Sequence, residues 1–196
     1  MVVEGGGPGQ GFLVSSEGPV QLAPASGAGD ASTMSADETT WNQLSEMRPD
    51  LAQAGRGLLY QYGVGLAFLA TVRSDGGPRL HPMCPLINEH GLFAFIVRSP
   101  KRDDLLRDER FALHSFPADD NEDAFYVAGT TREVADQGLR TALEDQFIEE
   151  RKSLSLDRSS MSDHILFEFL PSTCLLTRTT GHGDDRPVHD VWHASS

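Results

Sequence analysis

Apolar residues alternate with polar ones, or gather in short runs, along most of the chain from residue 66 to residue 176. Short runs of this kind, separated by turn residues, are typical of β-strands. They predict six strands, near residues 66–72, 79–87, 92–97, 111–116, 125–134 and 165–176. The segment Ser74-Asp75-Gly76-Gly77 is typical of a hairpin turn between the first two strands. The pattern therefore predicts a mainly β, α+β fold, a small antiparallel barrel with helices outside it.

Helical spacing occurs in fewer places. Pro49 suits the first turn of a helix, the apolar residues that follow recur at helical spacing, and Gly63 is placed to end the helix. A second helix is expected from about Gln137 to Arg151. Ser99 followed by Pro100 predicts the N-cap and first residue of a third helix.

The second predicted strand contains two prolines, Pro82 and Pro85. Because proline lacks a backbone donor, this strand is expected at a sheet edge or at a bulge. One interpretation is that the prolines protect an edge from aggregation. The other is that a flat ligand lies beside the strand.

Composition divides the chain into three parts. Residues 1–40 are rich in glycine and acidic residues, lack Lys and Arg, and are expected to be disordered. Residues 41–178 are expected to form the folded domain. Residues 179–196 form a polar tail with one tryptophan, Trp192, which could pack at a dimer interface or against a cofactor.

The net charge of −13 over 196 residues argues against nucleic-acid binding, because acidic surfaces repel phosphate backbones. No apolar stretch approaches the length of a membrane span. The two cysteines, Cys84 and Cys174, do not suggest a disulfide framework, so a cytoplasmic protein is expected. No metal site is expected either, since the pair His189 and His193 lacks supporting ligands.

Basic residues concentrate at the start of the third helix, where Arg98, Lys101 and Arg102 surround Ser99. A helix N-terminus favours negative charge, so cations there point to a bound anion such as a phosphate. The alternative is that these side chains merely pair with nearby carboxylates, namely Asp103, Asp104 and Asp108.

Five segments together resemble the split β-barrel proteins related to pyridoxamine 5'-phosphate oxidase. They are Ala70-Thr71-Val72-Arg73, Asp75-Gly76-Gly77-Pro78-Arg79-Leu80-His81-Pro82, Gly91-Leu92-Phe93-Ala94-Phe95, Ser99-Pro100-Lys101 and Arg110-Phe111-Ala112-Leu113. The resemblance implies a homodimer with FMN at the subunit interface. It also implies phosphate contacts from Ser99 and Lys101, and it places His81 at a position of the second strand where the family has a basic residue. Together with the basic cluster at the helix start, we expect a cofactor site that consists of His81, Pro82, Met83, Arg98, Ser99, Lys101 and Arg102.

The sequence departs from this family at several positions. His81 replaces a residue that is commonly arginine, no lysine lies near Leu86, and Arg186-Pro187-Val188-His189 only loosely matches the C-terminal motif of the oxidase. We therefore expect an FMN-dependent oxidoreductase that acts on a small molecule other than pyridoxamine 5'-phosphate. The alternatives are a deazaflavin-dependent reductase and a non-enzymatic module that binds flavin or haem. No catalytic side chain is assigned, and Cys84 is interpreted as a small residue near the flavin rather than a nucleophile.

The predicted strands also carry more large apolar residues than a small barrel should enclose. These include Phe93, Phe95, Phe111, Phe116 and Phe125. The surplus is expected to form the interface of a two-fold dimer.

Overall fold

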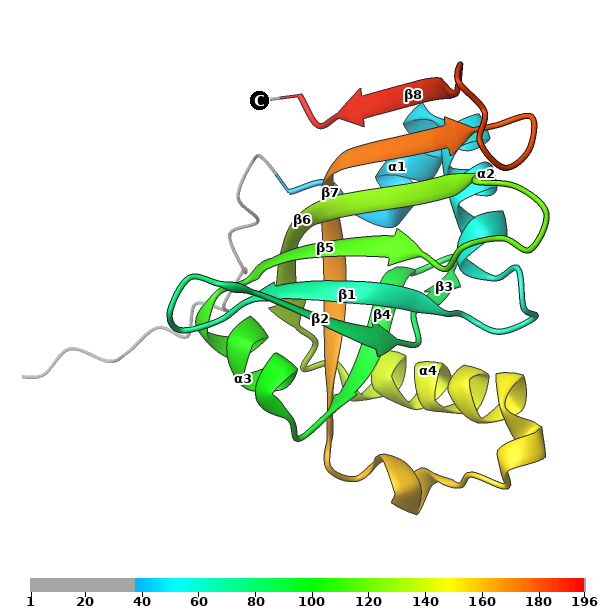
Figure 1. Cartoon of the computed structure of the whole chain (residues 1–196). Coiled ribbons are helices and arrows are strands. Elements are labelled where there is room, and N and C mark those ends of the chain that lie inside the picture. The colour runs from blue at the N-terminus through cyan, green and yellow to red at the C-terminus, as the bar shows by residue number, and fades with distance from the viewer. Residues whose placement is uncertain (1–37, 196) are drawn as a thin grey trace, which may run out of the picture. The chain divides into compact units, whose positions relative to one another are not determined.

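The computed structural model describes residues 38–195 (Figure 1). The expectation of disorder for residues 1–40 therefore falls almost entirely outside the described residues. The helices are α1 (Trp41–Met47), α2 (Pro49–Leu59), α3 (Pro100–Arg107) and α4 (Gln137–Glu150), with two short 3-10 turns, η1 (Lys152–Leu154) and η2 (Arg158–Met161). The strands are β1 (Ala67–Val72), β2 (Pro78–Met83), β3 (Leu86–Asn88), β4 (Gly91–Val97), β5 (Arg110–Ser115), β6 (Ala124–Glu133), β7 (His164–Arg178) and β8 (Val188–His193). None of the described helices is long and apolar enough to cross a membrane.

The eight described strands form one curled antiparallel sheet, in which seven follow the order β2-β1-β5-β6-β7-β4-β3 and β8 pairs with β7 outside this path. The long strand β7 pairs with β4 through its first residues and with β8 through its last. A register shift interrupts the pairing of β6 with β7 at Gly129, where a Cβ atom would lie 1.9 Å from the carbonyl oxygen of Leu170. Such irregularities increase local twist and help a sheet to curl. The half-barrel confirms the expected mainly β, α+β split-barrel class.

The strand count is higher than the six expected, for two reasons. The second predicted strand is divided into β2 and β3 at Cys84 and Pro85. The segment assigned to a polar tail contains β8, whose Trp192 is buried in the core opposite Cys174. As the prolines predicted, β2 lies at one end of the strand order.

Helices α1 and α2 lie against the inner face of the sheet, behind β6, β7 and β8 in Figure 1. The Trp41 ring of α1 packs edge-on against Phe125 of β6, with ring centroids 6.0 Å apart. Arg48, between the two helices, forms an ion pair of 2.6 Å with Asp190 of β8. The sequence reading did not predict α1, although Thr40 and Gln43 form a capping box at its start.

The phenylalanines expected at a dimer interface are mostly buried within the single chain. Phe93, Phe95, Phe111 and Phe125 are all buried within the single chain, and only Phe116 is partly exposed. Phe116 stacks on Phe68 with ring centroids 4.2 Å apart. The curled sheet and its helices enclose more apolar volume than a small barrel alone, so these side chains give no support to a dimer.

A buried carboxylate fixes α3 to the edge of the sheet. Asp104, which is 3% exposed, accepts hydrogen bonds from the Thr71 hydroxyl at 2.9 Å, from Arg79 Nε at 2.6 Å and from Arg107 at 3.1 Å. Burial opposes ionisation of this carboxyl group, but the three hydrogen bonds outweigh it and hold the pKa of Asp104 below its usual value. One residue therefore joins α3 to both β1 and β2.

Replacing this carboxylate should destabilise the fold in a pH-dependent way. We expect Asp104→Asn to lower the free energy of unfolding by about 1 to 3 kcal/mol at pH 7, because the two arginines lose their ionised acceptor and an amide NH2 group replaces one of the two acceptor oxygens. A lowered pKa stabilises the fold above about pH 4, where the unfolded carboxyl is ionised, and this contribution disappears as the pH falls through the folded-state pKa. Urea unfolding at pH 7 and at pH 3 measures both effects.

The exposed neighbour Asp103, for which no ion pair is found among the described residues, provides the matched control. Asp103→Asn should leave the free energy of unfolding nearly unchanged. Equal effects of the two variants at pH 7 would show that Asp104 does not anchor α3.

Candidate functional site

The end of β2 and the start of α3 meet at one corner of the molecule. We call the residues His81, Met83, Arg98, Ser99 and Lys101 the β2–α3 corner. Lys101 Nζ donates a hydrogen bond of 3.3 Å to the backbone carbonyl of Pro82, which brings the first turn of α3 beside the end of β2. Burial lowers the pKa of the Lys101 ammonium group, while the neighbouring Cys84 thiol opposes this shift. Lys101 is therefore a partly desolvated cation next to a strand edge.

The basic residues do not pair with the carboxylates that follow them in the sequence. Asp104 binds Arg79 and Arg107, and Asp108 binds Arg110 at 2.6 Å. Within residues 38–195, neither Arg98 nor Lys101 forms an ion pair. The alternative of a self-neutralised charged surface is therefore wrong for these two cations.

Ser99 occupies the N-cap position of α3, as predicted, but its side chain does not cap the helix. The Ser99 hydroxyl instead donates a hydrogen bond of 2.8 Å to the Val97 carbonyl. The Ser99 carbonyl accepts from the N–H groups of Arg102 and Asp103. Since Pro100 has no N–H group, the amide of Lys101 is the donor left in this first turn.

Arg102 points away from the corner. Its guanidinium group donates to the backbone carbonyl of Asp163 at 2.7 Å and lies 3.8 Å from the carboxylate of the same residue. The Arg102 side chain is 12% exposed, and its buried Nε atom has no hydrogen-bond partner in the described residues. The structure thus places Arg102 beside the start of β7 rather than with Lys101.

The three predicted residues of β2 lie on two faces of the sheet. His81 is opposite Leu69 and shares its inward face, and the His81 Nε2 atom is buried without a partner among the described residues. Met83 faces the same way and is packed in the core. Pro82 lies on the outer face, so only its carbonyl belongs to the corner. An unsatisfied buried nitrogen is costly, and a hydrogen-bonding ligand would remove that cost.

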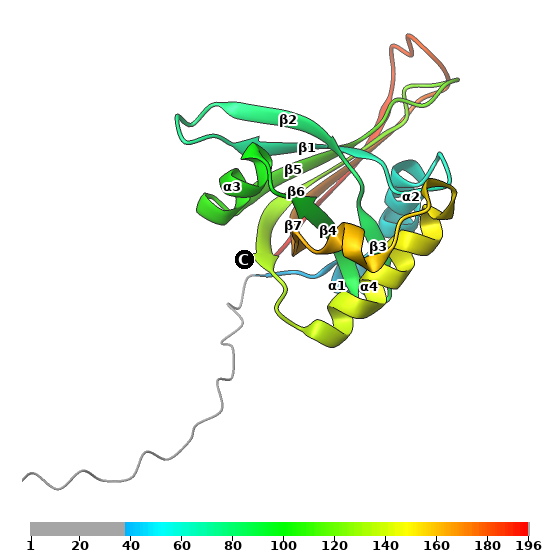
Figure 2. The same ribbon diagram turned by 90° about the horizontal axis from the view of Figure 1, so that it is seen from below.

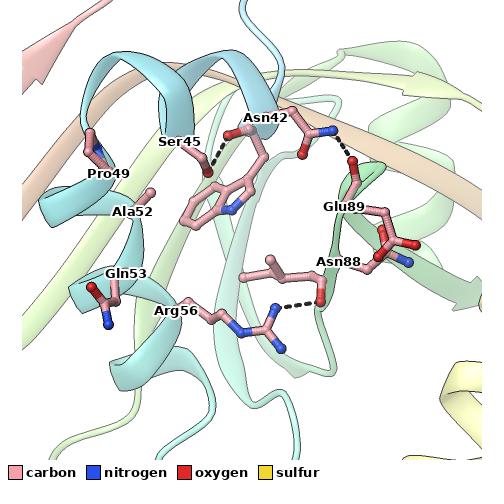
Figure 3. Close-up of a pocket in the computed structure, with 10 residues that line it drawn as sticks. Asn42, Ser45, Pro49, Ala52, Gln53, Arg56, Asn88 and Glu89 are labelled. Carbon is pink, nitrogen blue, oxygen red and sulfur yellow. Dashed lines mark hydrogen bonds between the residues drawn. The ribbon is translucent and has the colours of Figure 1, made fainter.

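Sequence reasoning missed a separate cavity of about 320 Å³ between α1, α2 and the β3–β4 turn (Figure 3). Asn42 donates to the Glu89 carbonyl on one side of it, and Arg56 donates to the Ile87 carbonyl at 2.7 Å on the other. Trp41 of α1 contributes to its lining. Residues nearly fifty positions apart build this cavity, so no local motif could have indicated it.

The two cysteines differ in environment. Cys174 is buried in the core, and burial raises the pKa of its thiol to about 12, which makes it unreactive. Cys84 is partly exposed and follows β2 directly. The described residues contain no cluster of His, Cys, Asp or Glu that could hold a metal ion.

The fold of this chain is similar to that of several solved structures, although its sequence has no close match. No protein-family model and no curated protein matches the sequence. Solved structures do match. HutZ, the heme storage protein from Vibrio cholerae, has a TM-score of 0.51 and 17% identity, over 63% of this chain and 89% of HutZ. A heme binding protein from Mycobacterium smegmatis has a TM-score of 0.53 and 13% identity, over 71% of this chain and 57% of that protein.

A third match is a protein of the pyridoxinephosphate oxidase family from Clostridium acetobutylicum, related to a general stress protein. Its TM-score is 0.50 and its identity 14%, over 71% of this chain and 95% of that protein. The chain has the split β-barrel fold. At these identities the matches establish the split barrel itself, whereas the ligand must be argued from the chain's own residues.

The geometry at Ser99 leads to a stability prediction. Because its hydroxyl does not cap α3, Ser99→Ala should change the free energy of unfolding by less than about 0.5 kcal/mol. Asp136 is the matched control, since its carboxylate accepts the Leu139 N–H at 2.8 Å and caps α4. Asp136→Ala should cost about 1 kcal/mol in thermal or urea unfolding. A Ser99→Ala loss as large as that of Asp136→Ala would show that Ser99 caps α3 in solution.

Proposed function

We propose that the protein is an FMN-binding oxidoreductase whose β2–α3 corner holds the phosphate of the cofactor. The observation that carries this proposal is Lys101, a partly desolvated cation without a carboxylate partner among residues 38–195, in a chain whose net charge is −13. Placing such a cation there without a counterion is unfavourable, and a bound phosphate supplies the missing charge.

The corner offers donors of the kind that a phosphate requires. Lys101 contributes its ammonium group and its backbone N–H, and the exposed Arg98 lies two residues before the helix. His81 contributes the unsatisfied Nε2 atom. Ser99 can donate to a phosphate only if its hydroxyl leaves the Val97 carbonyl, so we expect it to contribute less to phosphate binding than Lys101 does. Arg102 is directed elsewhere and is not included.

The flavin would supply the redox chemistry, by accepting a hydride and passing electrons onward. The chain's own residues would bind and orient it, and we assign none as a general acid or base. We propose that the substrate is a small molecule other than pyridoxamine 5'-phosphate, and that the enzyme is a cytoplasmic homodimer. The low cysteine content supports the cytoplasmic assignment.

A second candidate is a module that binds haem. It is favoured by the similarity to HutZ and to the heme binding protein from Mycobacterium smegmatis. Haem propionates are also anions, so Lys101 could bind either ligand. Riboflavin has the flavin ring but no phosphate, so comparing its binding with that of FMN distinguishes a flavin site from a general anion site. A deazaflavin coenzyme is the third candidate ligand, and the same titration tests it.

Replacing Lys101 should weaken FMN binding selectively. We expect Lys101→Ala to raise the dissociation constant of FMN about ten- to a hundredfold, because a hydrogen bond to a charged group is lost. Riboflavin should bind weakly to both forms, with little difference between them. Fluorescence titration with FMN, riboflavin, deazaflavin and haem measures these affinities.

The only other lysine, Lys152, provides the control. It is exposed and pairs with Glu149 at 2.9 Å, so Lys152→Ala should bind FMN as the wild type does. FMN binding that is equally tight in the Lys101→Ala variant would refute the phosphate assignment. Tight haem binding without flavin binding would favour the haem module.

A further inference from the structure

The cavity between α1, α2 and the β3–β4 turn lies apart from the β2–α3 corner. In Figures 1 and 2, α2 and α3 are at opposite sides of the molecule, and no residue of the corner lines the cavity. Its volume of about 320 Å³ is at the lower end of the range for small-molecule sites. A cavity of this size suits a single ring or a short chain rather than a nucleotide.

Several polar side chains around the cavity are already engaged. Asn42 of α1 donates to the Glu89 carbonyl, which joins the helix to the turn, and the Ser45 hydroxyl donates to the Trp41 carbonyl at 2.8 Å. These hydrogen bonds hold the cavity walls in place. Two further groups that line the cavity, the Arg56 guanidinium and the Trp41 indole, retain free donors.

Arg56 is an exposed cation with most of its donors free. Figure 3 shows its side chain reaching from α2 to the turn, where Nη1 donates to the Ile87 carbonyl at 2.7 Å. The guanidinium also lies over the Tyr60 ring, 5.0 Å from its centroid. No carboxylate within residues 38–195 forms an ion pair with Arg56, in a chain whose net charge is −13. The remaining N–H groups lie in one plane, which suits the two oxygens of a carboxylate.

Trp41 supplies an apolar surface and a second donor. The residue is 3% exposed, and its ring is held edge-on against Phe125. Its indole N–H has no acceptor among the residues that the structure describes, although a buried indole N–H usually finds one. Because Trp41 lines the cavity, an oxygen atom of a ligand there would supply the missing acceptor. Pro49, Ala52 and Ile87 add further apolar surface.

The charges around the cavity favour an anion. Among the described residues that line it, only Glu89 is acidic, and its side chain is 82% exposed, so water screens its charge. Arg56 is the only basic residue of the same set. A ligand with a carboxylate therefore gains an ion pair in the cavity, whereas an ammonium group would face a guanidinium group.

We propose that this cavity binds a small carboxylic acid with a compact apolar body. The carboxylate pairs with Arg56 and accepts the Trp41 indole N–H, and the ring or chain packs against Ala52 and Ile87. This second site goes beyond the proposed cofactor site and does not depend on it, because the two share no residue.

The two tryptophans of the chain make binding visible at a single residue. In heteronuclear NMR of the full chain, phenylacetate should shift the indole N–H signal of Trp41, assigned with Trp41→Phe, more than that of Trp192. Phenylacetamide keeps the ring without the charge, and acetate keeps the charge without the ring. Each should bind at least about tenfold more weakly than phenylacetate. A Trp41 signal that phenylacetate does not shift, or equal binding of phenylacetamide, would overturn the proposal.

Replacing Arg56 tests the ion pair. Arg56→Gln should raise the dissociation constant of phenylacetate at least about tenfold, because the charged partner of the carboxylate is lost. Arg56→Lys, which keeps the charge but not the planar fork, should have an intermediate affinity. Arg178→Gln is the matched control, since Arg178 is also exposed and without an ion pair in the described chain, but lies at the end of β7 outside the cavity. Phenylacetate affinity that is unchanged in Arg56→Gln would refute the assignment.

A cross-comparison separates this site from the β2–α3 corner. Lys101→Ala should leave phenylacetate binding unchanged, and Arg56→Gln should leave FMN binding unchanged. Loss of phenylacetate binding in Lys101→Ala would place the carboxylate at the corner and overturn the separate site. Failure of FMN to bind, with phenylacetate still bound through Arg56, would count against the proposed cofactor alone.

Discussion

The buried carboxylate of Asp104 is the contact on which the candidate site depends. It lies three residues after Lys101 in the same helix, and its three donors come from β1, from β2 and from α3 itself. Because Asp104 is held against the strands, the first turn of α3 is held beside the end of β2. The contact of Lys101 with the Pro82 carbonyl depends on this placement of the helix. The fold thus places a cation where it cannot be fully solvated.

The distribution of ion pairs sets this corner apart from most of the described chain. Most arginines of the described chain pair with carboxylates, as Arg48 does with Asp190 and Arg110 with Asp108. At the β2–α3 corner, Arg98 and Lys101 lack carboxylate partners within residues 38–195. An anion bound at this corner would supply the missing negative charge.

Sequence patterning predicted the sheet well because strand burial has a period of two residues. β1 alternates buried and partly exposed positions without a break, and the turn at Gly76 and Gly77 is a hairpin as expected. The pattern failed where this period is weak. β8 places two histidines and an aspartate among its six residues, so it read as a polar tail. α1 has only seven residues, and only Arg48 separates it from Pro49, so its short pattern was not distinguished from the start of α2.

The candidate site was predictable only in part. Ser99 and Pro100 correctly marked the start of α3, but nothing local showed that the Ser99 hydroxyl would bind the Val97 carbonyl instead of the helix. Asp104 looked like one carboxylate in a charged run, because its partners Thr71 and Arg79 lie on strands 33 and 25 residues away.

The most direct test of the proposed phosphate site is a crystal structure of the protein with FMN. We predict that the phosphate lies within hydrogen-bond distance of Lys101 Nζ and that His81 Nε2 contacts the same ligand. A phosphate bound elsewhere, with Lys101 still on the Pro82 carbonyl, would contradict it.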